Sequence, residues 1–150
     1  MENSVILYCK RLRPQAVLPV RATSGSAGMD LSACIEEPIT LAPGSRILIP
    51  TGIAAAIPQG AAGMIYARSS LGVKHGIALS NGVGVIDSDY RGEIHVGLCN
   101  FSSEPYTIHP GERIAQLVLH PVLLPKVLET QELDDTQRGA GGFGSTGRGI

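Results

Sequence analysis

Short runs in which apolar and polar residues alternate dominate the chain and predict β-strands. Turn residues separate these runs: Pro-Gly occurs at 43–44 and 110–111, and Pro-Gln-Gly at 58–60. Frequent turns between short strands favour an antiparallel all-β sandwich, barrel or jelly roll. The runs that we expect to form strands are residues 5–10, 35–41, 46–50, 53–57, 63–67, 77–79, 93–101, 106–108, 114–120 and 122–128.

One place interrupts the strand pattern and predicts a short helix. Ser69 and Ser70 precede a few apolar residues and are candidates to cap a turn or two of helix, which Gly76 would end. Arg68 directly before them offers a planar donor for phosphate oxygens, and the N–H groups of a helix start add further donors. The alternative is an ordinary cap with a surface arginine.

Residues 81–92, NGVGVIDSDYRG, lie between an incoming and an outgoing strand-like run, which is the pattern of a β-hairpin. A turn needs only Gly, Asn or Asp, yet Asp87, Asp89, Tyr90 and Arg91 fall within a few positions of one another. This density of carboxylate, phenol and guanidinium exceeds what a turn requires. We therefore treat the segment as a candidate binding pocket with Asp87 as its candidate general base.

Glycine dominates the C-terminal residues, with six glycines among the thirteen residues 138–150. GFGSTG at 142–147 has the spacing of a dinucleotide-binding loop, but such a loop follows a strand and opens a helix. One interpretation of this segment is an unstructured tail. The other is a lid, in which backbone N–H groups, hydroxyls and Arg138 meet an anion while Phe143 stacks on a base.

Composition narrows the remaining classes of function. Charged residues make up 17% of the chain and the net charge is −1, which argues against a broad nucleic-acid surface and favours surface buried between subunits. The three cysteines lack disulfide or zinc spacing, so we expect reduced thiols in a cytoplasmic protein. Neither a membrane-spanning run nor a signal segment is present. Lys10, Arg11 and Arg13 form a small basic cluster that we expect to be solvated.

Five short polar motifs occur in a fixed order between the strand-like runs. They are AGMDL at 27–31, ARSSLG at 67–72, NGVGVIDSDYRG at 81–92, GERIAQL at 111–117 and RGAGGFGSTG at 138–147. In this order, and over nearly the whole chain, they resemble the motifs of the trimeric deoxyuridine triphosphatases (dUTPases). Met29, Ser70 and Ala140 depart from the residues that are commonest in that family.

The resemblance implies an all-β, jelly-roll-like barrel or sandwich with one short helix and a flexible Gly-rich C-terminal arm. Residues 1–133 would form the jelly-roll domain, and residues 134–150 would form the arm that closes an active site. The implied assembly is a homotrimer with shared active sites and dUTP as its small-molecule substrate. We expect neither a nucleic-acid nor a membrane partner.

The reaction that the resemblance implies is the hydrolysis of dUTP to dUMP and diphosphate with Mg²⁺. Asp87 would activate the water that attacks the α-phosphate, Tyr90 would exclude a 2′-hydroxyl, and Asp30 would meet Mg²⁺ indirectly, through water. A narrow hairpin would exclude the thymine methyl group. The implied substrate-binding residues are Arg68, Ser69, Ser70 and Gln116 at the phosphates, Asn81, Gly84, Val85 and Ile86 at the uracil, and Arg138, Phe143, Gly144, Ser145 and Thr146 in the lid.

Two alternatives remain beside this reaction. The dCTP deaminase branch shares the fold but needs a catalytic glutamate on the strand after the pocket, where this chain has Gly97. A non-catalytic nucleotide-binding or regulatory trimer is the other alternative. Loss of Asp87 or of the tail motif would have favoured it, and both are present.

Overall fold

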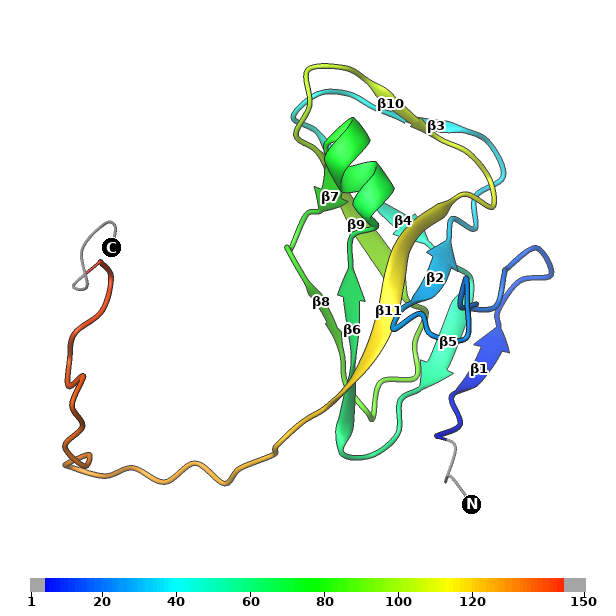
Figure 1. Ribbon diagram of the computed structural model, residues 1–150. Helices are drawn as coiled ribbons and strands as arrows, with labels where there is room; N and C mark the ends of the chain where they lie inside the picture. Colours follow the sequence, from blue (N-terminus) through cyan, green and yellow to red (C-terminus); the bar gives the residue numbers. More distant parts are fainter. Residues whose placement is uncertain (1–4, 145–150) are drawn as a thin grey trace.

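A computed structural model describes residues 5–144 of the chain, which fold as an all-β jelly roll with a long C-terminal extension (Figure 1). The frequent turns predicted from the sequence separate short antiparallel strands. Within the described range the elements are β1 (Tyr8–Arg11), β2 (Met29–Ser32), β3 (Ile39–Leu41), β4 (Arg46–Pro50), β5 (Ile53–Ala56), β6 (Ala61–Tyr66), η1 (Ser70–Lys74), β7 (Ile77–Leu79), β8 (Gly84–Ile86), β9 (His95–Asn100), β10 (Tyr106–Ile108) and β11 (Arg113–Pro121).

The strands pair antiparallel in two larger sheets and two strand pairs. One sheet has the order β2-β11-β6-β8 and the other β4-β9-β7, while β1 pairs with β5 and β10 with β3. Along β9 the side chains alternate between buried and more exposed, as expected for a sheet with one face on the core. The expected fold class is therefore confirmed.

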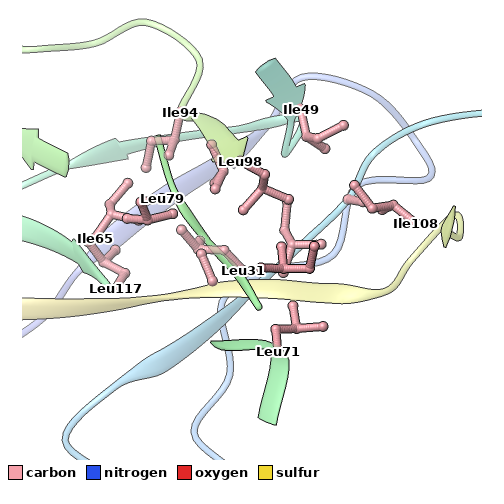
Figure 2. Packing of buried hydrophobic residues seen from close by; sticks show 14 of the residues in the cluster. Leu31, Ile49, Ile65, Leu71, Leu79, Ile94, Leu98, Ile108 and Leu117 are labelled. Carbon is pink, nitrogen blue, oxygen red and sulfur yellow. The ribbon is translucent and has the colours of Figure 1, made fainter. Parts of the chain in front are cut away.

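The core lies between the sheets and is built from aliphatic side chains of strands far apart in the sequence (Figure 2). Leu31 of β2, Ile49 of β4, Leu98 of β9, Ile108 of β10 and Leu117 of β11 are each at most 1% exposed. Burying one such side chain stabilises the fold by about 1.5–3 kcal/mol. Together, the buried side chains of this cluster fix the strands from which the surrounding loops extend.

The predicted helix is a single wide turn, the π-helix η1, and its buried anchor is Leu71. Ser69 occupies the position before it but makes no capping hydrogen bond through its side chain, so that part of the expectation is wrong. Gly76 ends the turn at φ +67°, a conformation that favours glycine. A Cβ at Gly76 would also lie 3.0 Å from the backbone nitrogen of Ser102.

The two runs that flank residues 81–92 pair antiparallel, as a hairpin requires, but no tight turn joins them, because β8 lies within the connection. The flanking runs pair with each other, β7 with β9, whereas β8 leaves them and pairs with β6 in the other sheet. Ile86 of β8 packs against the main core, which favours this exchange between sheets. Residues 81–92 therefore leave the β4-β9-β7 sheet after β7 and contribute β8 to the edge of the β2-β11-β6-β8 sheet.

Two further expectations about strands are wrong. The motif around Asp30 contains β2, which the sequence did not predict as a strand of its own. Residues 122–128 do not form a strand: β11 ends at Pro121, and every residue from 123 to 141 is exposed. A strand needs a hydrogen-bonding partner; the Val122 N–H donates to the Gly60 carbonyl oxygen at 2.9 Å, but the described part of the chain offers no backbone partner to residues 123–128. None of the described helices has the length and apolar character needed to cross a membrane.

Candidate active site

Four of the sequence-predicted residues, Asp30, Arg68, Ser69 and Gln116, meet at one end of the four-stranded sheet. Strand register sets Gln116 of β11 between Asp30 of β2 and Tyr66 of β6, and Arg68 follows two residues after Tyr66. They line a cavity of about 320 Å³, which we call the Asp30 cleft. Its lining residues are Ala22, Ser26, Ala27, Gly28, Asp30, Arg68, Ser69 and Gln116.

Asp30 is paired with two arginines in this cleft. Its Oδ1 accepts from Arg68 Nε at 3.1 Å, and its Oδ2 accepts from Arg113 Nη1 at 3.1 Å. Arg68 also donates to the carbonyl oxygen of Arg113, at 3.2 Å. Two guanidinium groups around one carboxylate leave a net positive charge, which suits an anion. Arg113 was not among the predicted site residues, although it stands in the GERIAQL motif.

Gln116 faces the cleft rather than the core, whereas its neighbours Ala115 and Leu117 are fully buried. Its amide Nε2 donates to the carbonyl oxygen of Ala67 at 3.0 Å, which fixes the side chain beside Arg68. A Cβ on Gly28 would lie 2.3 Å from the Gln116 side-chain oxygen, so a larger residue there would displace the Gln116 side chain. The motifs around residues 28, 68 and 116 therefore build one site.

A second cavity, of about 240 Å³, lies at the end of β8, and we call it the Asp87 pocket. Its lining residues are Val85, Ile86, Asp87, Tyr90, Glu93 and His95. Asp87 is exposed, and its carboxylate takes part in no ion pair within residues 5–144. An exposed, unpaired carboxylate keeps its lone pairs available to accept a proton from water.

Tyr90 is folded back onto its own segment beside Asp87. Its backbone N–H donates to the carbonyl oxygen of Asp87 at 3.2 Å, which closes a turn. Its hydroxyl donates to the carbonyl oxygen of Glu93 at 2.8 Å. A Cβ on Gly92 would lie 2.5 Å from that hydroxyl, so glycine at this position makes room for the ring.

The remaining predicted residues lie apart from these two cavities or at their edges. Asn81 is exposed at the start of the segment, and Gly84 packs close to Ile65. Ser70 is exposed in η1. Arg138 and Phe143 are exposed on the C-terminal extension, away from the body of the molecule (Figure 1), together with Gly144. Ser145 and Thr146 lie outside the described residues.

The two cavities share no residue, and strand register explains why. Gln116 stands opposite Tyr66 at one end of β6, while Ile86 stands opposite Gly63 near the other end, with Asp87 beyond it. At about 3.3 Å per residue and 4.8 Å between strands, the backbones of Gln116 and Asp87 are roughly 15 Å apart. A single chain therefore does not bring both side chains onto the same phosphate.

The donor set allows a test of whether these residues suit a metal ion. Within the described range, no group of three or more His, Cys, Asp or Glu residues could hold a metal by itself. Both oxygens of Asp30 accept from arginine, which leaves it suited to contact through water. Mg²⁺ commonly keeps several waters and takes its other oxygens from phosphates and one or two carboxylates. Asp30 fits that outer role.

A family model described as dUTPase matches residues 15–147. A deoxyuridine 5′-triphosphate nucleotidohydrolase from Hahella chejuensis is 54% identical over 139 residues, which are 92% of this chain and 91% of that protein. One from Neisseria meningitidis is 52% identical over 132 residues, 87% of this chain and 88% of that protein.

Solved structures of dUTPases share the fold. A variant dUTPase of Staphylococcus bacteriophage 80alpha with dUpNHpp superposes with a TM-score of 0.83 at 27% identity, covering 96% of this chain and 99% of that one. A variant dUTPase of phage phi11 of S. aureus, solved for the coordination of a structural Mg(II) ion, shares the fold at a TM-score of 0.79 and 24% identity, with coverages of 87% and 100%.

Proposed function

This chain belongs to the dUTPase family and hydrolyses dUTP to dUMP and diphosphate, and we propose that Asp87 is the general base of this reaction. The observation that carries the proposal is the exposed Asp87 carboxylate, which no ion pair engages in the described chain, on the wall of the Asp87 pocket. Asp87 takes a proton from water, the water oxygen attacks the α-phosphorus, and the bond to the β-phosphate bridging oxygen breaks. A positioned base of this kind contributes about 10²–10⁴ to the rate.

The Asp30 cleft holds the phosphates. Arg68 and Gln116 present donors that are already fixed by Asp30 and by Ala67, so little ordering remains when an anion arrives. Ser69 and Ser70 add hydroxyls at its exposed edge. Asp30 would hold a bound Mg²⁺ through water, and the ion would supply positive charge that partly neutralises the phosphates. The phi11 dUTPase with a structural Mg(II) ion shares this fold.

The 81–92 segment selects the nucleoside. The Asn81 amide and the backbone of Gly84, Val85 and Ile86 read the uracil edge, and wrong hydrogen-bonding edges are rejected because they leave buried groups unpaired. Tyr90 closes the sugar side of the pocket against a 2′-hydroxyl. The dUTPase of phage 80alpha, solved with dUpNHpp, supports a deoxyuridine nucleotide as the ligand.

A homotrimer with shared sites completes the arrangement. The distance between the Asp30 cleft and the Asp87 pocket favours a site that takes one region from each of two chains. Exposed apolar side chains support buried surface between copies, among them Leu48 at 63% and Val85 at 58% exposure. Residues 1–133 are the domain, and residues 134–150 are an arm that closes over a neighbour's site with Arg138, Phe143, Gly144, Ser145 and Thr146.

The compartment that we propose is the cytoplasm. Cys9, Cys34 and Cys99 are all free thiols. Free thiols persist where glutathione and thioredoxin keep the environment reducing.

One substrate panel tests the function. With Mg²⁺, diphosphate release is expected from dUTP and is expected to be weak or absent with UTP, dTTP and dCTP. Ammonia release from dCTP would indicate the deaminase instead. Gly97 speaks against that alternative, because glycine has no carboxylate to serve as the deaminase's glutamate, and a Cβ there would displace the Ser80 hydroxyl. Binding of dUTP without any turnover would indicate the non-catalytic trimer.

A further inference from the structure

Glu93 follows the 81–92 segment and joins it to two distant parts of the chain. Its carboxylate accepts from the Arg13 guanidinium and from the backbone N–H of Gly52, the latter at 2.7 Å. The imidazole Nε2 of His95 lies 3.7 Å from its second oxygen. The Glu93 side chain is only 16% exposed, so the carboxylate is a largely buried group with charged and neutral donors around it.

Both anchor points are held in place by the fold. Arg13 was expected in a solvated basic cluster, yet it spans from Glu93 to Cys34, whose sulfur accepts from its Nε at 3.4 Å. Gly52 adopts φ +68°, and a Cβ there would lie 2.7 Å from the Cβ of Ala16. The turn that supplies the Gly52 N–H is therefore closely packed and cannot follow Glu93 if the carboxylate moves.

The backbone of Glu93 carries this fixation to Tyr90. Its carbonyl oxygen accepts the Tyr90 hydroxyl at 2.8 Å, while its side chain is held by Arg13 and Gly52. Removing a charged hydrogen-bonding partner from a largely buried site commonly costs more than the bond itself contributes, because the other partner is left unsatisfied. Loss of the Glu93 carboxylate would therefore free the residue to which the tyrosine ring is tethered.

We propose that Glu93 is the positioning residue for Tyr90, and that its contacts with Arg13 and Gly52 set how strongly the enzyme prefers dUTP over UTP. The inference rests on the proposed function, since it assumes that Tyr90 closes the sugar side. A wall excludes a hydroxyl only if it stays within a fraction of an ångström of the sugar. Glu93 supplies that rigidity from the wall of the pocket, through its contacts with Tyr90, Arg13 and Gly52.

The test compares kcat/KM for dUTP and for UTP in several full-length variants. Glu93→Gln keeps the shape and can still accept from Gly52, but it loses the ion pair. Arg13→Met removes the same ion pair from the other side and serves if Glu93 variants fold poorly. The matched control is Glu36→Gln, an exposed carboxylate outside both cavities. Tyr90→Phe is the reference, because it keeps the ring and loses the tether.

For Glu93→Gln and Arg13→Met, the ratio of kcat/KM for dUTP to that for UTP is expected to fall by roughly 10- to 100-fold. An effect of this size is typical when a positioning group, here the Tyr90 ring, is displaced by about 1 Å. Tyr90→Phe is expected to shift the ratio in the same direction, and Glu36→Gln is expected to leave it unchanged. The double variant Arg13→Met/Glu93→Gln should lose no more than either alone, because both remove one interaction.

A ratio that stays at the wild-type value in Glu93→Gln and Arg13→Met, with both rates falling equally, would overturn the proposal and leave Glu93 with a purely structural role. That outcome is distinct from failure of the proposed function. The proposed function fails only if the wild-type enzyme releases no diphosphate from dUTP.

Discussion

The Asp30 cleft and the Asp87 pocket hold their central carboxylates in opposite ways. Asp30 has an arginine on each oxygen, at 3.1 Å in both cases, whereas Asp87 takes part in no ion pair in the described chain. A neutralised carboxylate positions cations for an incoming anion, and an unpaired one accepts protons. The two regions therefore suit different tasks, anion binding and proton transfer, and one chain keeps them roughly 15 Å apart.

Asp87→Asn is expected to give the largest effect. The amide keeps the shape of the pocket but cannot act as a base, so turnover should fall by about 10²–10⁴ while dUTP still binds. Diphosphate release and calorimetric titration of dUTP with the variant measure the two quantities. Unchanged turnover would remove Asp87 from the chemistry.

Mixed oligomers of two inactive variants test whether one site takes its two regions from different chains. Chains carrying Asp87→Asn keep an intact Asp30 cleft, and chains carrying Arg68→Ala keep an intact Asp87 pocket. If sites form between chains, an equal mixture, unfolded and refolded together, should recover about one quarter of the wild-type sites. Activity no higher than the sum of the separate variants would place both regions of a site on one chain.

Truncation after Gln137 should come next in size. It removes Arg138, Phe143 and Gly144, which lie on the exposed extension, so the domain should keep its fold and its assembly. Without a lid, water and the triphosphate are less well confined, and we expect roughly a 10²-fold loss of kcat/KM. Light scattering controls for assembly, and retained full activity would indicate an unstructured tail without a catalytic role.

The residues of both regions could be predicted from the sequence because each motif combines several polar groups with glycine within a few positions. Their partners could not be predicted, since those contacts are distant along the chain. Arg113 and Asp30 are 83 positions apart, and Arg13 and Glu93 are 80 apart. No local pattern distinguishes such an arginine from a solvated one.

The fold class was also predictable, because alternation and turns are local properties, whereas strand pairing is not. Residues 77–101 have the pattern of a hairpin, and β7 and β9 do pair, but the partial burial of Ile86 against the main core favours placing β8 in the other sheet. The extension after Pro121 has apolar residues suited to a strand. It lacks a partner in the described chain, which a sequence pattern does not reveal.

Asp30→Asn tests the cleft alone and should have a smaller effect than loss of the base. The amide leaves Arg68 and Arg113 without their charged acceptor, so KM for dUTP should rise about tenfold. The Mg²⁺ concentration for half-maximal rate should rise with it, while kcat changes less. Glu37→Gln, an exposed carboxylate outside both cavities, is the control. A large fall in kcat with unchanged KM would indicate that Asp30 acts in the chemical step.

The smallest effect is expected for loss of the hydrogen bond between Tyr106 of β10 and Glu112, which lies in the turn before β11. The Tyr106 hydroxyl donates to Glu112, and burial, followed by this hydrogen bond, raises the pKa of Tyr106 from 10.0 to about 12. A pKa that is higher in the folded state means that the neutral phenol stabilises the fold fully below pH 10, and that this contribution is lost as the pH rises towards 12. Tyr106→Phe lacks this dependence.

Urea midpoints of the wild type and of Tyr106→Phe, at one protein concentration, should therefore converge between about pH 10 and about pH 12. At pH 8 the variant should be the less stable, by roughly the 0.5–1.5 kcal/mol of one hydrogen bond. Its kcat at pH 8 should stay at the wild-type value, because Tyr106 lines neither the Asp30 cleft nor the Asp87 pocket. Urea midpoints that stay parallel over the whole pH range would show that ionisation of Tyr106 does not weaken the fold. A fall in kcat at pH 8 would show that Tyr106 also affects the catalytic site.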